Sequence, residues 1–233
     1  MKFQVLRAAC WASLCLPATA EIESSVPLGI EALTGLRSGY VHRGFDLADT
    51  SLEFQFAGKV TLSNENSLHF GLSHLAESNG DFSETAGYLE LDQKLSDRLH
   101  AGISATYRDR SHGILDGGLD LGIFTSFSIN EDWEWRNELN YDFGADGTYL
   151  ASEITWSKAL SDQVYLSLSG GLSYLSDYEN NSGLNDFFAR ISLNYAFSDQ
   201  VDFSPFLGTS VPLDSGGSSN GIIYGGLWFQ VIF

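Results

Sequence analysis

The chain has very little cysteine and methionine. Its 233 residues include 2 cysteines and 1 methionine, and both cysteines, Cys10 and Cys15, lie close to the N-terminus. Removal of a leader that ends at Ala20 would leave a mature chain without either residue type. A mature chain without cysteine has no disulfide scaffold, no thiolate metal site and no cysteine nucleophile.

Basic residues are also scarce. The chain has 12 Lys and Arg against 30 Asp and Glu, and loss of Lys2 and Arg7 with the leader would leave 10 against 30, a net charge of −20. Nucleic-acid binding needs clustered Lys and Arg, so we expect no nucleic-acid partner. An acidic surplus suits loops that meet divalent cations at a lipopolysaccharide surface, and it equally suits a purely solubilising charge.

Long apolar runs are absent beyond the first twenty residues, so no transmembrane helix is predicted. Residues 1–20 have the features of a secretory signal peptide: two early basic residues, a short apolar stretch over 8–16, and small residues before Glu21. Lipidation at Cys15 is the alternative, although Leu14 is large for the preceding position. We therefore expect residues 1–20 to be a signal peptide and residues 21–233 to be the mature domain.

A short turn motif recurs along the mature chain at spacings of 31 to 37 residues, which indicates one repeated structural unit. Its Ser, Asn and Asp residues favour tight turns, because their side chains bond to nearby backbone. The copies lie at 62–66, 95–98, 129–132, 160–163 and 197–200.

Looser breaks rich in Gly and Asp alternate with these turns, at 45–50, 78–83, 111–117, 144–147, 177–183 and 214–220. Five turns and six breaks divide the chain into twelve strands, or ten if two breaks interrupt single strands. Bacterial outer-membrane barrels have even strand numbers, short turns at one end and longer loops at the other. With these boundaries, each loop has about four to seven residues, and we expect none to fold inward as a plug.

Apolar and polar residues alternate within the segments, which is typical of strands with one apolar face. Over 133–143, for example, Trp133, Trp135 and Leu139 oppose Glu134, Arg136 and Glu138. A soluble β-sandwich has the same period, with the polar face outside. The signal peptide, the strand lengths, the aromatic residues near segment ends and the terminal Phe233, which resembles a barrel-insertion signal, favour a transmembrane antiparallel up-and-down β-barrel, an all-β fold.

In a membrane barrel the polar faces point into the lumen. These inward charges would either pair into a network that fills the barrel or line a narrow path and set ion preference. The candidate lumen-lining residues are Arg37, Glu53, Lys59, Glu90, Asp92, Arg108, Glu134, Arg136, Glu138, Glu153 and Arg190.

The sequence offers no convincing catalytic or cofactor site. His74 and Ser78 are four residues apart, about 13 Å along a strand, which is too far for proton transfer. Ser111 and His112 are adjacent and point to opposite faces of a strand. Acidic residues expected near the loops could bind a divalent cation weakly, but without a defined ligand spacing. They are Asp81, Glu84, Asp116, Asp120, Asp146, Asp177, Glu179 and Asp214.

The segment Tyr40-Val41-His42-Arg43-Gly44-Phe45 resembles the Y-x-x-R-G signature of the TorF-like family of outer-membrane porins. His42 stands where that pattern has an aromatic residue. The resemblance implies a porin. Locally, we expect Arg43 to fix the first outer turn by pairing with Asp46 or Asp49.

The sequence therefore predicts a non-enzymatic barrel of the Gram-negative cell outer membrane, which acts as a small passive porin-like channel with a mixed-charge, net acidic lumen. The alternatives are a closed structural or adhesion barrel and an outer-membrane lipid hydrolase. Expected partners are outer-membrane lipid and lipopolysaccharide, the barrel-assembly machinery, and small ions or solutes. No cofactor is expected.

Overall fold

The computed structural model describes residues 11–12, 15–16, 28–214 and 220–233. The expected signal peptide, 1–20, lies outside the described residues apart from β1 (Trp11–Ala12) and β2 (Cys15–Leu16), which pair with each other. Among the described residues, no helix is long and apolar enough to cross a membrane.

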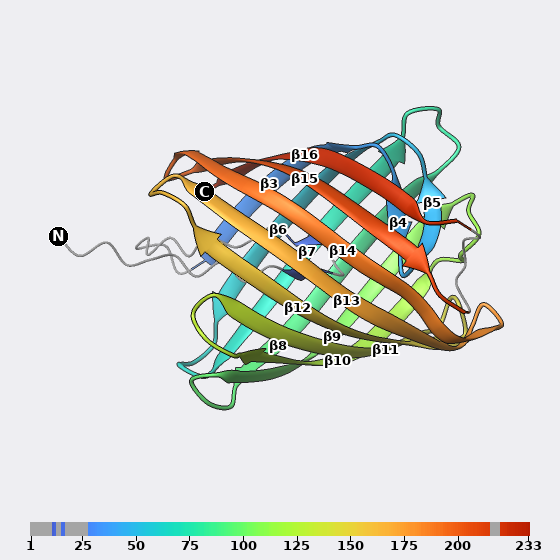
Figure 1. The fold of residues 1–233 in the computed structure, drawn as a ribbon, viewed down its shortest axis with the longest axis horizontal. Coiled ribbons are helices and arrows are strands. Elements are labelled where there is room, and N and C mark those ends of the chain that lie inside the picture. Colours follow the sequence, from blue (N-terminus) through green and yellow to red (C-terminus); the bar gives the residue numbers. More distant parts are fainter. Residues whose placement is uncertain (1–10, 13–14, 17–27, 215–219) are drawn as a thin grey trace.

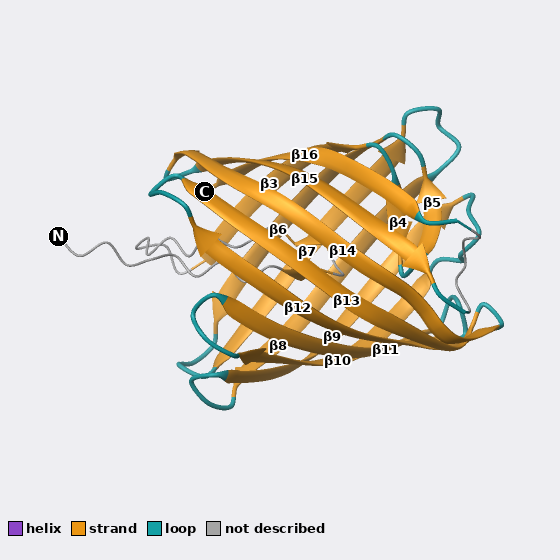
Figure 2. Ribbon diagram, viewed as in Figure 1, coloured by secondary structure: helices purple, strands orange, loops and turns teal. Residues whose placement is uncertain are grey.

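Twelve of the described strands form one closed antiparallel barrel (Figures 1 and 2). Its strands are β3 (Leu28–Arg37), β6 (Ser51–Thr61), β7 (Asn66–Glu77), β8 (Ser83–Lys94), β9 (Leu99–Ser111), β10 (Gly118–Ser128), β11 (Trp133–Asp142), β12 (Gly147–Ala159), β13 (Val164–Tyr178), β14 (Asn181–Ser198), β15 (Val201–Pro212) and β16 (Ile222–Ile232). Consecutive strands are neighbours, and β16 pairs with β3 to close the wall. The prediction of twelve strands is confirmed, and the ten-strand alternative is wrong.

The five predicted tight turns all lie at one end of the barrel, which we call the turn end. In each of them a Ser or Asn side chain accepts a backbone N–H from two or three residues further along. Ser63 accepts from Asn66 and Ser96 accepts from Leu99, both at 3.1 Å. Asn130, Ser161 and Ser198 do the same in the other turns. The repeated motif is therefore a repeated side-chain cap.

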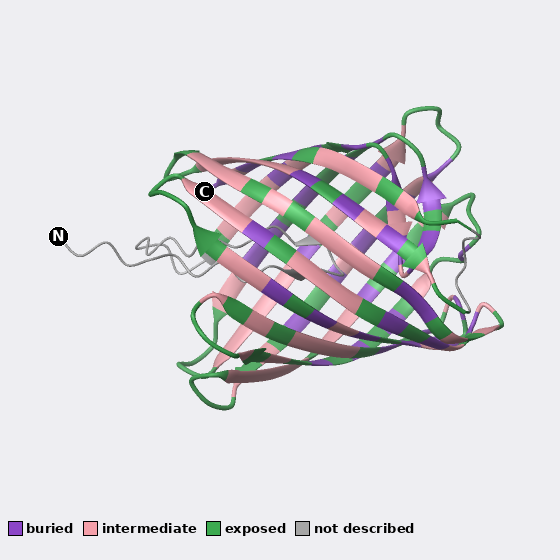
Figure 3. Cartoon of the chain, viewed as in Figure 1, coloured by how far each residue is buried: buried purple, intermediate pink, exposed green. Residues whose placement is uncertain are grey.

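Outward and inward residues alternate along every strand (Figure 3). Large apolar side chains are exposed on the outer surface, as Leu139, Leu168 and Phe229 illustrate. Many of the inward positions between them carry polar or charged side chains that are buried, as for Glu90, Asn140 and Gln230. The predicted division of each strand into an apolar and a polar face is confirmed.

Aromatic rings fill part of the interior by lying over glycines of the neighbouring strand. At each of six glycines, a Cβ atom would come closer than 3.0 Å to the ring directly opposite in the strand register. Glycine at these positions leaves space for a ring to lie against the wall. The pairs are Gly35–Trp228, Gly71–Tyr88, Gly102–Phe124, Gly171–Phe188, Gly208–Tyr224 and Gly226–Phe206.

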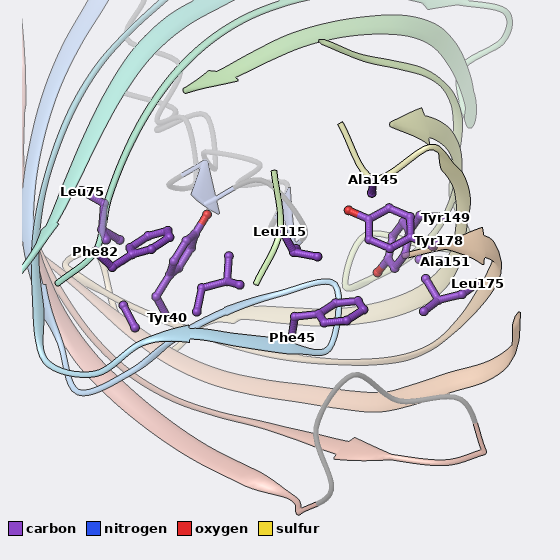
Figure 4. Packing of buried hydrophobic residues seen from close by; sticks show 12 residues of the cluster. Tyr40, Phe45, Leu75, Phe82, Leu115, Ala145, Tyr149, Ala151, Leu175 and Tyr178 are labelled. Carbon is purple, nitrogen blue, oxygen red and sulfur yellow. The ribbon is translucent and has the colours of Figure 1, made fainter. Parts of the chain in front are cut away.

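One expectation about the loops is wrong. The first connection at the loop end, opposite the turn end, spans 38–50 rather than 45–50, and it contains a hairpin of β4 (Tyr40–His42) and β5 (Phe45–Ala48). Tyr40, His42 and Phe45 of this hairpin are buried. The hairpin folds inward across the mouth of the barrel (Figures 1 and 4), so a loop does act as a partial plug.

Candidate functional site

The hairpin β4–β5 turns at Arg43 and Gly44, both of which have positive φ angles of 52° and 82°. Two consecutive residues with positive φ make the type I′ turn that suits a two-residue hairpin. At Gly44 there is a second requirement, because a Cβ atom would lie 2.6 Å from the Asn185 side-chain nitrogen of β14. The Arg-Gly dipeptide thus fits both the turn and its close approach to the opposite wall.

Apolar side chains hold the hairpin in the mouth of the barrel. Tyr40 lies 6.1 Å from Phe82 between ring centroids, and Phe45 lies 5.7 Å from Tyr178 on the other side (Figure 4). We call the whole buried group the mouth cluster. It consists of Tyr40, Phe45, Leu47, Ala48, Leu75, Phe82, Leu115, Ala145, Tyr149, Ala151, Leu175 and Tyr178.

Arg43, at the tip of the hairpin, reaches charged groups on the far wall. Its guanidinium forms ion pairs with Asp120 of β10 and with Asp142 of β11, the latter at 3.2 Å. It also donates a hydrogen bond to the Tyr178 hydroxyl at 3.4 Å and lies over the Tyr149 ring, 4.8 Å from its centroid. Its side chain is only 7% exposed. The expected pairing of Arg43 with Asp46 or Asp49 is therefore wrong, because the turn points into the barrel.

Both carboxylates that hold Arg43 have further donors. Arg108 pairs with Asp120 at 3.0 Å. The Tyr178 hydroxyl and the Gly144 backbone N–H each donate to Asp142 at 2.9 Å. These additional donors stabilise the buried carboxylates, as a buried ion pair requires, although Asp120 Oδ1 has no hydrogen-bond partner among the described residues.

The backbone of the hairpin tip is held as well. Asn185, which is fully buried, donates from its side-chain nitrogen to the Arg43 carbonyl at 2.8 Å and to the Ser173 hydroxyl at 2.9 Å. The neighbouring Asp186 accepts hydrogen bonds from Ser173 and, at 2.6 Å, from Ser210. β13, β14 and β15 together therefore form a polar seat for the turn.

A second contact attaches the base of the hairpin to β8. The Tyr40 hydroxyl donates to Glu84 at 2.8 Å, and Arg110 donates to the same carboxylate at 2.6 Å. Glu84 and Asp120, which we expected near the loops as weak cation ligands, instead point into the mouth and pair with arginines. Within the described ranges, no group of three or more His, Cys, Asp or Glu side chains is arranged to hold a metal ion.

His42 lies inside the mouth in an environment that disfavours its charged form. Burial, followed by the charges of Arg108, Arg110 and Arg43, lowers the pKa of its imidazole well below the ordinary value of 6.5. Its Nε2 atom is buried and has no hydrogen-bond partner among the described residues. His42 is therefore neutral at pH 7, and protonation would add a positive charge beside those of Arg108, Arg110 and Arg43.

A small polar cavity lies below Arg43, towards the middle of the barrel. Its volume is about 20 Å³, enough for about one water molecule. Arg43, Glu90, Arg136 and Glu138 are among its lining residues. Arg136 is 3.7 Å from the Glu90 carboxylate, and neither Glu90 oxygen has a hydrogen-bond partner among the described residues.

The predicted lumen residues lie at inward strand positions from the mouth to the turn end. Arg37 and Glu53 pair at 2.5 Å, near the mouth, and the Arg37 guanidinium lies 4.9 Å from the Trp228 ring centroid. Arg190, at mid-height, lies over the Phe206 ring at 4.1 Å. The others occupy the inward faces of β6, β8, β9, β11 and β12: Lys59, Glu90, Asp92, Arg108, Glu134, Arg136, Glu138 and Glu153.

The candidate catalytic pairs are not assembled. His74 bonds to Thr85 at 2.9 Å on the outer surface, and Ser111 bonds to Ser83 at 2.7 Å. His112 is exposed in the loop that follows Ser111. Neither histidine is recorded in contact with the serine proposed for it.

Sequence reasoning missed the partners of the hairpin, namely Asp142, Tyr178 and Asn185. These residues are 99, 135 and 142 positions away from Arg43 along the chain. One sequence feature could have indicated the hairpin. On both sides of Arg43-Gly44, residues suited to burial occupy alternate positions, Tyr40 and His42 before the turn and Phe45 and Leu47 after it. That alternation predicts a small hairpin, although it does not show which way the hairpin folds.

No protein-family model and no curated protein sequence matches the chain. Solved structures do match it. The KdgM porin, in complex with disordered oligogalacturonate, is 11% identical and has a TM-score of 0.57, with 88% of this chain and 99% of that chain covered. The NanC porin is 12% identical, with a TM-score of 0.54 and coverage of 88% and 98%.

An outer membrane channel from Pseudomonas putida F1 is 12% identical and has a TM-score of 0.57, with 91% of this chain and all of that chain covered. At such low identity these likenesses concern the fold. The chain therefore has the closed antiparallel barrel fold that outer-membrane porins and channels share.

Proposed function

We propose that this protein is an outer-membrane channel whose outer mouth is narrowed by the hairpin β4–β5. The observation that carries the proposal is the ion pairing of Arg43 with Asp120 and Asp142 across a barrel whose interior carries many charged side chains. The fold likeness to porins and to an outer membrane channel supports it. So does the resemblance of 40–45 to the TorF-like porin signature, since those residues build the hairpin.

The surface of the barrel supports the membrane placement. Exposed leucine, isoleucine and phenylalanine side chains surround it, whereas most charged side chains of the same strands point inward; Asp109 and Lys158 are outward exceptions. Such a surface is unfavourable in water and suits lipid, and a closed barrel leaves no unpaired strand edge in the hydrocarbon. We assign the turn end to the periplasm and the loop end to the outside, with lipid and lipopolysaccharide around the barrel and Phe233 as the signal read by the assembly machinery.

Passage would be controlled at two levels. The hairpin sets the width of the mouth. Below it, acidic residues including Glu134 and Glu138 and basic residues including Arg136 and Arg190 present both signs of charge to a passing ion. Rings of charged side chains set ion preference in pores. The acidic surplus favours small cations, and we propose no catalytic role.

A closed structural barrel is the second candidate, and a specific observation favours it. The mouth cluster is buried and apolar, and the polar cavity beneath Arg43 holds about one water molecule. If the hairpin always stays docked in the mouth, the protein would be a closed structural barrel that conducts no ions or solutes.

Planar-bilayer conductance of the refolded protein separates the two. The informative variant replaces residues 40–48 with a three-residue Gly-Gly-Ser linker, which can bridge the strands because Arg37 and Ser51 are register partners. A channel narrowed by the hairpin predicts a larger conductance for this variant than for the wild type. If neither protein conducts although both fold, the closed barrel is correct.

Ion preference is tested in the same bilayer by reversal potentials in a salt gradient. The double variant Glu134→Gln, Glu138→Gln is expected to reduce the preference for cations. The matched control is Glu65→Gln with Glu131→Gln, which removes two exposed acids in the tight turns. Equal shifts for both pairs would show that general charge, and not the lumen, sets the selectivity.

A further inference from the structure

The amide side chain of Asn137 lies in the middle of the apolar outer surface. Outward positions of β11 carry Trp133, Trp135, Leu139 and Tyr141, all of which are large and exposed. Asn137 occupies the outward position between Trp135 and Leu139. Aromatic residues mark the two interfaces of a membrane barrel, so an amide flanked by Trp135 and Tyr141 lies at the depth of the hydrocarbon.

Asn137 is the centre of a short polar row that crosses three strands. Its register partners are Thr125 on β10 and Ser152 on β12. Above and below this row the same wall carries exposed Ile123 and Ile154. The row is therefore a local interruption of the apolar surface and not part of a polar rim.

The members of the row differ in their hydrogen bonding. The Trp135 indole N–H donates to the Ser152 hydroxyl at 2.9 Å. No hydrogen bond to the Asn137 amide is recorded from the described part of the chain. An amide has two donors and an acceptor, and hydrocarbon satisfies none of them. The Asn137 side chain therefore needs a partner that brings hydrogen-bonding groups to this depth.

We infer that the outer wall formed by β10, β11 and β12 is the docking surface for a second copy of this chain, with Asn137 of both copies at a two-fold axis along the membrane normal. This inference rests on the proposed membrane placement. Two asparagine amides are self-complementary, because each donates an N–H to the carbonyl of the other. A two-fold contact repeats the same patch on both subunits, as this pairing requires.

Charge also favours a second copy at this wall. The chain carries a net charge of −18, so two copies repel each other wherever acids face one another. The outward positions of β10, β11 and β12 hold no acidic side chain, and their one charged residue is Lys158 near the turn end of β12. This wall is therefore a place where two copies can approach. The opposite side of the barrel differs from this wall. There the outward Thr34 of β3 has two phenylalanines, Phe54 and Phe229, as its register partners, so no row of polar side chains flanks it.

Cysteine crosslinking in membranes tests the inference. Replacing Cys10 and Cys15 with serine gives a cysteine-free chain. Asn137→Cys in this background is expected to give an oxidation product of twice the barrel mass. Thr34→Cys is the matched control, since it is an outward position on β3, six strands away from β11 in the barrel order, and it is expected to give none.

A second variant tests the amide itself. In a Thr125→Cys reporter crosslinked by a short bis-maleimide, Asn137→Leu is expected to weaken the dimer roughly three- to twenty-fold, the range measured for hydrogen bonds between membrane segments. Leucine suits the lipid-facing wall, so the barrel should still fold, as heat-modifiable gel mobility will show.

Three results would overturn the inference: a folded Asn137→Cys barrel that stays monomeric, equal crosslinking at Thr34→Cys, or an Asn137→Cys adduct with a protein of different mass. The conductance of a single barrel is expected to be unchanged by Asn137→Leu. A barrel that crosslinks through Asn137→Cys but never conducts would therefore keep the interface and contradict the channel, so the two proposals can fail separately.

Discussion

The substitution Arg43→Gln is expected to release the hairpin β4–β5 from the far wall of the barrel. Glutamine retains much of the length of arginine and keeps hydrogen-bonding groups, but it removes the charge. It loses the ion pairs with Asp120 and Asp142 and the cation contact with Tyr149. The apolar contacts of the mouth cluster remain, so the variant isolates the contribution of the charge.

The loss of docking free energy in this variant depends on the partners that the two carboxylates keep. Removing one partner of a buried ion pair costs about 3–5 kcal/mol. Here Asp120 keeps Arg108 at 3.0 Å, and Asp142 keeps the Tyr178 hydroxyl at 2.9 Å. The cost should therefore fall near the lower end, at about 3 kcal/mol, which corresponds to a change of about 150-fold in the ratio of docked to released hairpin.

The assay is single-channel recording of wild type and variant at pH 7.5, with gel mobility to check that both barrels fold. We expect openings of Arg43→Gln to be more frequent by about two orders of magnitude if the released hairpin is the conducting state. Arg98→Gln, in an exposed turn at the other end, is the control and should match the wild type. Identical open probabilities for Arg43→Gln and the wild type would refute the idea that this ion pair holds the mouth closed.

The remaining predictions concern pH and packing. The released hairpin binds more protons than the docked one, because the docked pKa of His42 is depressed. Docking should be strongest above pH 6.5 and should weaken progressively as the pH falls below it. Conductance should therefore rise on acidification in the wild type but not in His42→Phe. Gly35→Ala should destabilise the barrel by about 1–3 kcal/mol in urea titration, because its methyl group meets Trp228, whereas Gly29→Ala has open space and should be neutral.

The sequence predicts the barrel wall well because each of its signals is local. The turn motif contains its own cap, as in Ser63 and Ser96, and the period of two identifies the apolar face of every strand. Closure into a barrel is expected from the number of strands, because the sequence predicts no helix or other layer that could cover their apolar faces. None of these inferences requires knowledge of contacts between distant residues.

The mouth could not be predicted in the same way. Tyr40 and Phe45 fit a short strand pair equally well whether that pair extends outward or folds into the lumen. The choice depends on Asp120, Asp142 and Asn185, which come from three strands on the opposite wall and are brought together only by barrel closure. Turn-forming residues around 46–50 also suggested a shorter loop than the structure has.

The Gly35–Trp228 pair has a consequence for how the barrel is completed. β3 and β16 are the first and last strands of the wall, and their pairing closes it. A slip of one residue would turn the indole towards the outer surface, and a slip of two would place it on Leu33 or Arg37, where a side chain occupies its space. The Gly35–Trp228 pair therefore favours the observed register between β3 and β16 over these shifted ones. It thereby disfavours a misaligned pairing at the last step of barrel closure.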